Sequence, residues 1–186
     1  QFPSNALTAS QRDQLLKSKD DSTRTRAEKL FAELKTGDRM KAFEQNKAVL
    51  TMPANPRAGQ GLFKTHCASC HRLDREGVAV GPDLFGIRNQ PKEAILLHLI
   101  VPNYEIMAGF AAYDIETRDG RTLSGIVTSE SPSSITLRQS QGIEETIRRD
   151  DIVSLNASGK SLMPDALEAT MSRQELADLI AYLKGQ

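Results

Sequence analysis

The sequence predicts a mainly α-helical fold into which a small antiparallel β sheet or barrel is inserted. Apolar residues follow helical spacing over most of the chain up to about residue 101. Between residues 112 and 156, apolar and polar residues alternate instead, and Asp119-Gly120 is typical of a two-residue hairpin turn. Helical spacing returns near the C-terminus. We therefore expect one helical domain that is interrupted by strands.

Three short helices are predicted at the start of the chain. Thr8 with Gln11 is a candidate cap for the first helix, and apolar stripes at residues 27–34 and 40–50 indicate two more. Two prolines then break the helical spacing and mark a linker. We expect residues 1–56 to form a helical extension and linker with a structural role.

The motif that organises the next domain is Cys67-Ala68-Ser69-Cys70-His71. Cys-x-x-Cys-His is the attachment pattern for a c-type haem, in which each cysteine forms a thioether and the histidine reaches the iron. These are the only two cysteines in the chain. Phe63 lies one helical turn before Cys67 on the predicted first helix, so we expect its ring to lie against the haem edge.

An irregular stretch follows the motif and contains Gly81-Pro82-Asp83-Leu84. The carbonyl of Pro82 is well suited to accept the proton on Nδ1 of His71, which leaves Nε2 free for iron. Pro91 then opens a helix that runs to about residue 101 and contains His98.

Five short strands are predicted in the segment that interrupts the helices, at residues 113–117, 123–128, 134–138, 144–148 and 151–155. Ser161-Leu162-Met163-Pro164 is then a loop, and Ser172 with Glu175 forms a capping box for the last helix. We therefore divide the helical domain into residues 57–112 and 157–186, with residues 113–156 as an inserted β module.

These motifs, in this order, resemble a class I c-type cytochrome. The run from Arg57 to Leu183 is more narrowly similar to the haem-binding domain of large planctomycete and verrucomicrobial proteins, which also carries Asp-Gly-Arg in a hairpin-rich insert and Ser-Leu-Met-Pro. The resemblance covers about two thirds of the chain, and one departure from it is Val101-Pro102-Asn103, where the family often has Asp-Pro-Ser. It implies one covalent haem c, whose iron is held by His71 and Met163, with Pro82 as the acceptor for His71.

Other ligands for the iron remain open at this stage. Met107, in the loop before the strands, is the main rival of Met163, and His98 would give bis-histidine ligation. Cys67, Cys70 and His71 could instead bind zinc, but structural zinc sites usually show a second pair of ligands, and the sequence has none.

Composition excludes several classes of partner. The formal net charge is zero, so bulk charge indicates neither a nucleic acid nor a membrane surface. The longest apolar run, residues 94–101, is far too short to span a bilayer. The chain starts Gln1-Phe2-Pro3-Ser4 without a signal peptide, so we expect a processed protein or a piece of a larger one. Because haem is normally attached to this motif outside the bacterial cytoplasm, we expect a periplasmic or otherwise exported location.

The function that these features predict is transfer of single electrons, without an enzymatic activity of the chain's own. The resemblance implies a redox partner, and a fused or separate dehydrogenase is the expected electron donor. A haem-based sensor or a peroxidase-like enzyme with a displaceable sixth ligand is the alternative. A third interpretation, compatible with the first, is that the inserted strands dock a partner and so tune the haem.

Overall fold

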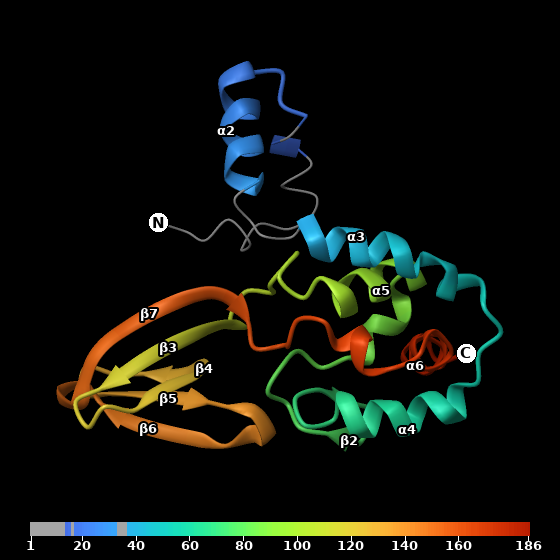
Figure 1. Ribbon diagram of the computed structural model, residues 1–186. Coiled ribbons are helices and arrows are strands. Elements are labelled where there is room, and N and C mark those ends of the chain that lie inside the picture. Colours follow the sequence, from blue (N-terminus) through green and yellow to red (C-terminus); the bar gives the residue numbers. More distant parts are fainter. Residues whose placement is uncertain (1–13, 16, 33–36) are drawn as a thin grey trace.

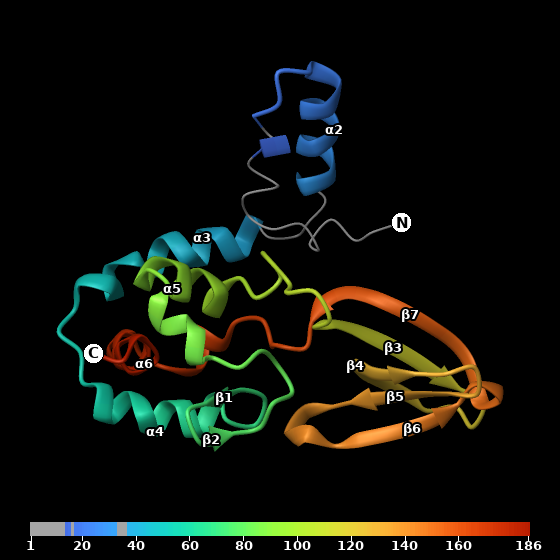
Figure 2. The same cartoon turned by 180° about the vertical axis from the view of Figure 1, so that it is seen from behind.

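In the computed structural model, which describes residues 14–15, 17–32 and 37–186, helices and a β sheet lie side by side (Figures 1 and 2). A five-stranded antiparallel sheet forms one side, and helices α3 to α6 form the other. None of the helices in these residues is long and apolar enough to cross a membrane.

The helices, with the 3-10 turns between them, are α2 (Asp21–Ala32), α3 (Gly37–Asn46), η2 (Lys47–Thr51), α4 (Pro56–His66), η3 (Phe85–Asn89), α5 (Lys92–Ile100), η4 (Ser140–Gly142), η5 (Arg149–Asp151), η6 (Leu167–Thr170) and α6 (Arg173–Lys184). The strands are β1 (Arg72–Leu73), β2 (Glu76–Gly77), β3 (Ala111–Thr117), β4 (Thr122–Glu130), β5 (Ser134–Arg138), β6 (Glu144–Arg148) and β7 (Ile152–Ser161).

The prediction of a mainly α fold is wrong, because 44% of the chain is helical and 25% is strand. The five-stranded antiparallel sheet itself is present where it was expected. Three of its strands are longer than the alternation predicts: β3 has 7 residues, β4 has 9 and β7 has 10. Strand β7 extends because its later residues continue to pair with β3, up to the pair formed by Ala111 and Ser161. The protein is therefore an α+β fold.

The start of the chain contributes to the helical core. Phe43 of α3 and Val49 of η2 are buried in the same apolar cluster as Phe63 and Ile180. Arg39 of α3 also donates to the carbonyl of Ile100 at 3.0 Å. The division at residue 56 stays a prediction, but the core is continuous across it.

Two predictions for the N-terminal helices fall outside what the structure describes. The cap at Thr8 and Gln11 lies outside the described residues, and so do the side chains of Leu30, Phe31 and Leu34 in the apolar stripe at residues 27–34.

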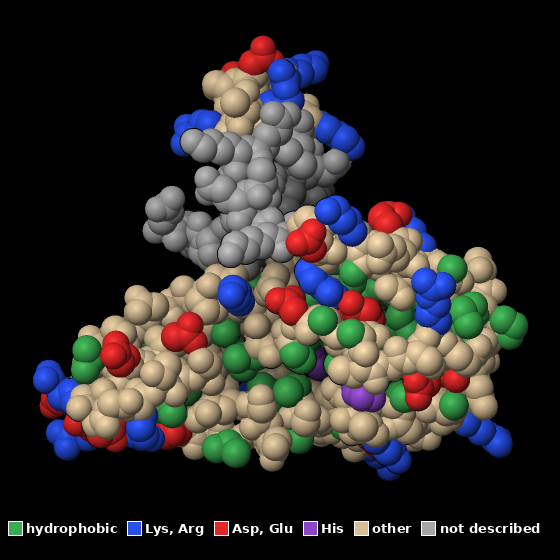
Figure 3. Space-filling view, viewed as in Figure 1, with side chains coloured by type: hydrophobic (Ala, Val, Ile, Leu, Met, Phe, Trp, Pro, Cys, Tyr) green, Lys and Arg blue, Asp and Glu red, His purple; other side chains and the backbone are tan. Residues whose placement is uncertain are grey.

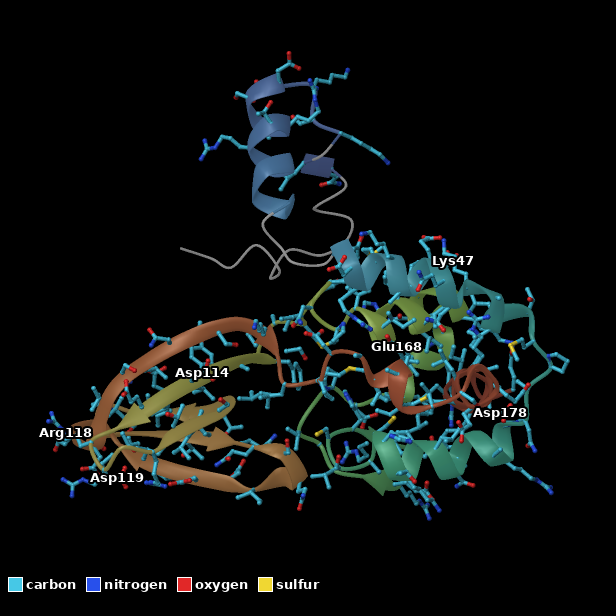
Figure 4. All side chains as sticks on the ribbon, in the orientation of Figure 1. Lys47, Asp114, Arg118, Asp119, Glu168 and Asp178 are labelled. Carbon is cyan, nitrogen blue, oxygen red and sulfur yellow. The ribbon has the colours of Figure 1, made fainter. Side chains whose placement is uncertain are left out.

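The first and last helices of the haem-motif domain, α4 and α6, cross in close contact. Gly59 of α4 lies directly against the backbone of Asp178 on α6. Asp178 is buried, and its carboxylate accepts a hydrogen bond from the backbone N–H of Asn55 at 2.7 Å (Figure 4). It therefore ties the start of α4 to α6. The predicted capping box of Ser172 and Glu175 opens α6.

The sheet has the order β6-β5-β4-β3-β7 and a small core of its own. Ile115, Ile135, Leu137 and Ile147 form that core, and none of them belongs to the helical cluster. The hairpin between β3 and β4 lies at the end of the sheet that points away from the helices, where Arg118 and Asp119 are labelled in Figure 4.

The turn at this hairpin differs from the two-residue prediction. The N–H of Gly120 donates to the carbonyl of Thr117 at 2.9 Å, and the N–H of Thr117 donates to the carbonyl of Arg121 at 2.9 Å. Gly120 has a φ of 84°, which completes a three-residue turn with a bulge. Asp119 accepts hydrogen bonds from Thr117 and Arg121, so the Asp-Gly-Arg motif builds the turn.

Candidate functional site

The two cysteines and the histidine of the motif lie on one turn that continues α4. The carbonyl of Cys67 accepts hydrogen bonds from the N–H of Cys70 at 3.0 Å and from the N–H of His71 at 2.8 Å. Residues spaced three and four apart on such a turn share a face. The backbone therefore presents both thiols and the imidazole toward the same side of the chain.

The imidazole of His71 is held from two sides. Its Nδ1–H donates to the carbonyl oxygen of Pro82 at 2.9 Å, and since a carbonyl can only accept, this fixes the tautomer with Nε2 unprotonated. The backbone of Gly81 packs closely against the imidazole ring, because a Cβ built at this position would stand 2.6 Å from Cε1 of His71. The ring thus has one orientation, with a lone pair on Nε2.

Burial lowers the pKa of His71, and the hydrogen bond to Pro82 only partly opposes this effect. The imidazole is therefore neutral near pH 7, which is the form that binds a metal ion. Burial, with a smaller contribution from Cys70, raises the pKa of the Cys67 thiol to about 12. Such surroundings suit a neutral thioether and disfavour the thiolate that zinc requires.

The loop that carries Pro82 is itself anchored to strand β1. The N–H of Leu84 donates to the carbonyl of Arg72 at 2.8 Å, and the Arg72 guanidinium pairs with the carboxylate of Asp83 at 2.8 Å. Asp83 also accepts from the N–H of Phe85 at 2.9 Å. The acceptor for His71 is therefore part of a structured turn.

Gly81→Ala tests this arrangement. We expect it to lower the free energy of unfolding by about 1–3 kcal/mol, because the new methyl group would have to displace the His71 ring from the Pro82 carbonyl. Denaturant unfolding, followed by absorption of the bound prosthetic group, measures the effect. Gly86→Ala is the matched control, since nothing lies within 4 Å of that position. Equal stabilities of the two variants would show that Gly81 does not hold the ring.

Phe63 lies one turn before Cys67 and is completely buried. Its ring centroid is 5.6 Å from that of Tyr182 on α6, so the aromatic pair joins the two helices close to the motif. The sequence predicted Phe63 at the edge of the prosthetic group; the structure shows its place at the crossing of α4 and α6.

Met163 follows the end of β7 and is half-buried against the helical core cluster. Its rival Met107 is 60% exposed. His98 on α5 is half-buried, and burial lowers its pKa. Across residues 14–15, 17–32 and 37–186, no group of three or more His, Cys, Asp or Glu side chains is arranged to hold a metal ion.

The β sheet meets the motif at the tip of the β5–β6 hairpin (Figures 1 and 2). The N–H of Gln141 donates to the carbonyl of Ser69, which lies between the two cysteines, at 3.0 Å. Arg138 donates to the carbonyl of Ala79 at 3.0 Å. The same tip presses on Val78, since a Cβ on Gly142 would stand 2.7 Å from Cγ1 of that side chain.

Hydrophobic side chains and histidines gather in the middle of the face seen in Figure 3, between the sheet and the helices. This is the region where the loop after β7 and the loop after the motif run past each other in Figure 1.

A family model for cytochrome c matches residues 56–186. The chain belongs to the cytochrome c family. A curated relative, a cytochrome c-553-like protein of Synechocystis sp., is 28% identical over 53 residues, which cover 28% of this chain and 50% of that protein. The chain thus spans about half the length of the curated relative that it matches.

As a cytochrome c, the protein carries haem c, bound covalently, with its iron. The residues present fit this group. Both thiols are free, the Nε2 lone pair of His71 is available, and Gly81 keeps the space beside the imidazole clear of a side chain. Cytochromes c generally act with redox partner proteins.

Three features of the site were not predicted from sequence. They are the contact of Gly81 with the His71 ring, the bond between Gln141 and Ser69, and the hydrogen bonds of Asn103 described below. Gly81 carried a signal, because a glycine before the acceptor proline indicates close packing. The other two join distant segments, and nothing in the local sequence pattern marks them.

Proposed function

We propose that this chain is a monohaem electron-transfer domain in which His71 and Met163 are the two axial ligands. Cys67 and Cys70 would hold the haem by thioether bonds, Pro82 would fix the tautomer of His71, and Phe63 would pack near the haem edge. The observation that carries the proposal is the imidazole of His71, which is neutral, half-buried and oriented by the Pro82 carbonyl at 2.9 Å.

The structure supports Met163 over Met107 as the second ligand. Met163 packs against the helical core, whereas Met107 is 60% exposed. A ligand with a fixed position on each face leaves little to move when an electron arrives, and a thioether ligand raises the reduction potential. Bound haem c supplies the iron that alternates between the ferric and ferrous states.

The chain's residues would hold that group beside the apolar core of the helices. The neutral imidazole needs no proton transfer to bind, because its proton already lies on the side of Pro82. The apolar core behind Phe63 excludes water, which favours the less charged ferrous form. These are the properties of an electron carrier.

The electron donor and the location that we propose follow the resemblance to the planctomycete and verrucomicrobial haem-binding domain. On that basis, a fused or separate dehydrogenase would supply the electrons, and the protein would function in the periplasm or otherwise outside the cytoplasm. The inserted sheet is a candidate docking site for such a partner, since it meets the haem-attachment loop at Ser69 and Ala79.

The sixth ligand can be tested in the oxidised protein by its far-red sulfur-to-iron charge-transfer band. We expect the band in the wild type and its complete loss in Met163→Ala, because alanine leaves no sulfur near the iron. Met107→Ala is the matched control and should retain the band. A wild type without the band that binds carbon monoxide readily when reduced would favour the haem sensor or peroxidase-like alternative.

A further inference from the structure

One side chain, Asn103, is hydrogen-bonded on both sides of Met163. Its Oδ1 accepts the backbone N–H of Ser161 at 2.8 Å, and its Nδ2 donates to the carboxylate of Asp165 at 3.3 Å. The hydroxyl of Ser161 in turn accepts the backbone N–H of Met163 at 3.1 Å. Met163 therefore lies in a short loop whose two ends are joined through a single amide group.

Asn103 is itself rigidly placed. It follows Pro102 in a turn that is closed by a hydrogen bond of 2.9 Å from the N–H of Tyr104 to the carbonyl of Val101. Proline at the second position favours such a turn, and both Val101 and Pro102 are buried. Because the N–H of Val101 also caps α5 by donating to the carbonyl of Leu97 at 2.7 Å, Asn103 extends from the end of a core helix.

The strand side of the loop is held as well. Ser161 is the last residue of β7 and pairs with Ala111, the first residue of β3. The N–H of Ser161 donates to Asn103, so this hydrogen bond lies at the point where the strand ends and the loop begins. The planar amide of Asn103 offers an acceptor and a donor on one group, and these two contacts use both.

We propose that Asn103 is a positioning residue that keeps the Met163 thioether at the iron. The inference rests on the proposed ligation by Met163 and adds to it what limits opening of the loop. Without the amide, the N–H of Ser161 loses its acceptor and Asp165 loses its donor. The loop then opens more often, and the iron becomes accessible to added ligands.

The test is the apparent affinity of the oxidised holoprotein for imidazole, followed by loss of the charge-transfer band. Imidazole competes with Met163, so its apparent affinity is proportional to the fraction of molecules with an open loop. Removal of both hydrogen bonds of the Asn103 side chain should increase that affinity about tenfold in Asn103→Ala. Amide hydrogen exchange at Ser161 in the reduced protein should become faster in the same variant.

The double variant Asn103→Asp with Asp165→Asn exchanges donor and acceptor and keeps the net charge. It can restore both hydrogen bonds, so its imidazole affinity should stay within about twofold of the wild type. Asn156→Ala, at an exposed position on β7, is the matched control and should leave the affinity unchanged. If Asn103→Ala fails to fold, Asp165→Ala removes one of the two bonds and should still raise the affinity.

Unchanged imidazole affinity in Asn103→Ala, or an increase in the exchanged double variant as large as in Asn103→Ala, would overturn the inference. Failure of the proposed ligation has a different signature. In that case the wild type lacks the charge-transfer band, and Met163→Ala binds imidazole no more tightly than the wild type does.

Discussion

Gly59→Ala should lower the free energy of unfolding by about 3 kcal/mol, the upper end of the usual cost of overpacking. A Cβ at position 59 would stand 2.0 Å from the carbonyl oxygen of Asp178 and 2.8 Å from Cβ of Tyr182. The first of these contacts is with backbone, which cannot rotate away. The two helices would have to separate, and the pair of Phe63 and Tyr182 would separate with them.

The same helix provides the control for this prediction. Gly61 lies two residues further along α4, and nothing lies within 4 Å of a Cβ placed there. Gly61→Ala should therefore stabilise the protein by about 0.5–1 kcal/mol, since alanine is the better helix former. Denaturant unfolding of both variants measures the difference. If Gly59→Ala is as stable as Gly61→Ala, α4 and α6 do not cross at this glycine.

Removal of the β sheet should lower the reduction potential of the haem while leaving its ligands in place. Tyr113 and Ala157 are partners on adjacent strands, so an Asn-Gly turn between them can replace residues 114–156 and keep the pair of Ala111 and Ser161. The helical core should survive, because none of its buried residues comes from the sheet. Solvent would then take the place of the hairpin tip, whose Gln141 N–H donates to the carbonyl of Ser69 in the attachment loop.

Two measurements on this shortened protein separate the roles of the sheet. Redox titration should give a lower potential, and the oxidised protein should retain its charge-transfer band, because Asn103 lies outside the sheet and still holds Ser161. A potential equal to that of the full chain would show that the sheet does not tune the haem. The matched comparison is Gln141→Gly, which keeps the N–H donor and the left-handed backbone of the hairpin tip and should leave the potential unchanged.

Local patterns predicted the elements of this protein well, for physical reasons. The capping box of Ser172 and Glu175 satisfies the free N–H groups of a helix wherever it occurs, and it opens α6 as expected. Five strands were predicted from segments of alternating apolar and polar residues that are separated by turn residues. Such alternation arises because each strand buries one face. The haem-attachment motif could be recognised because its chemistry requires two thiols and an imidazole within one turn.

The balance of fold class could not be predicted in the same way. Polar residues at the end of β7, such as Ser158 and Lys160, resemble a loop, yet that strand runs to Ser161 because β3 pairs with it. Tertiary pairing overrode local propensity there. The N-terminal helix α3 was expected in a helical extension, and the sequence did not show that its Phe43 would be buried in the helical core. Amphipathic spacing shows which face is buried but not what covers it.

Contacts between segments that are distant in the chain could also not be predicted from the sequence. Asn103 and Ser161 are 58 residues apart, and the hydrogen bond between them depends on the path of the whole sheet. The bond from Gln141 to Ser69 depends on the same path. Such contacts would decide how firmly the two proposed ligands are held. The motifs identify only which residues the ligands are.

The ligation by Met163 is tested most directly by the methyl resonances of the methionines in the reduced protein. The chain has five methionines, and labelling their methyl groups with carbon-13 gives one signal for each. A methyl group bound through sulfur to the iron lies directly over the haem, where the ring current moves its proton resonance far upfield. We expect one such signal, and we expect Met163→Leu to remove it. The account is contradicted if no methyl signal lies far upfield, or if the shifted signal persists in Met163→Leu and disappears in Met107→Leu.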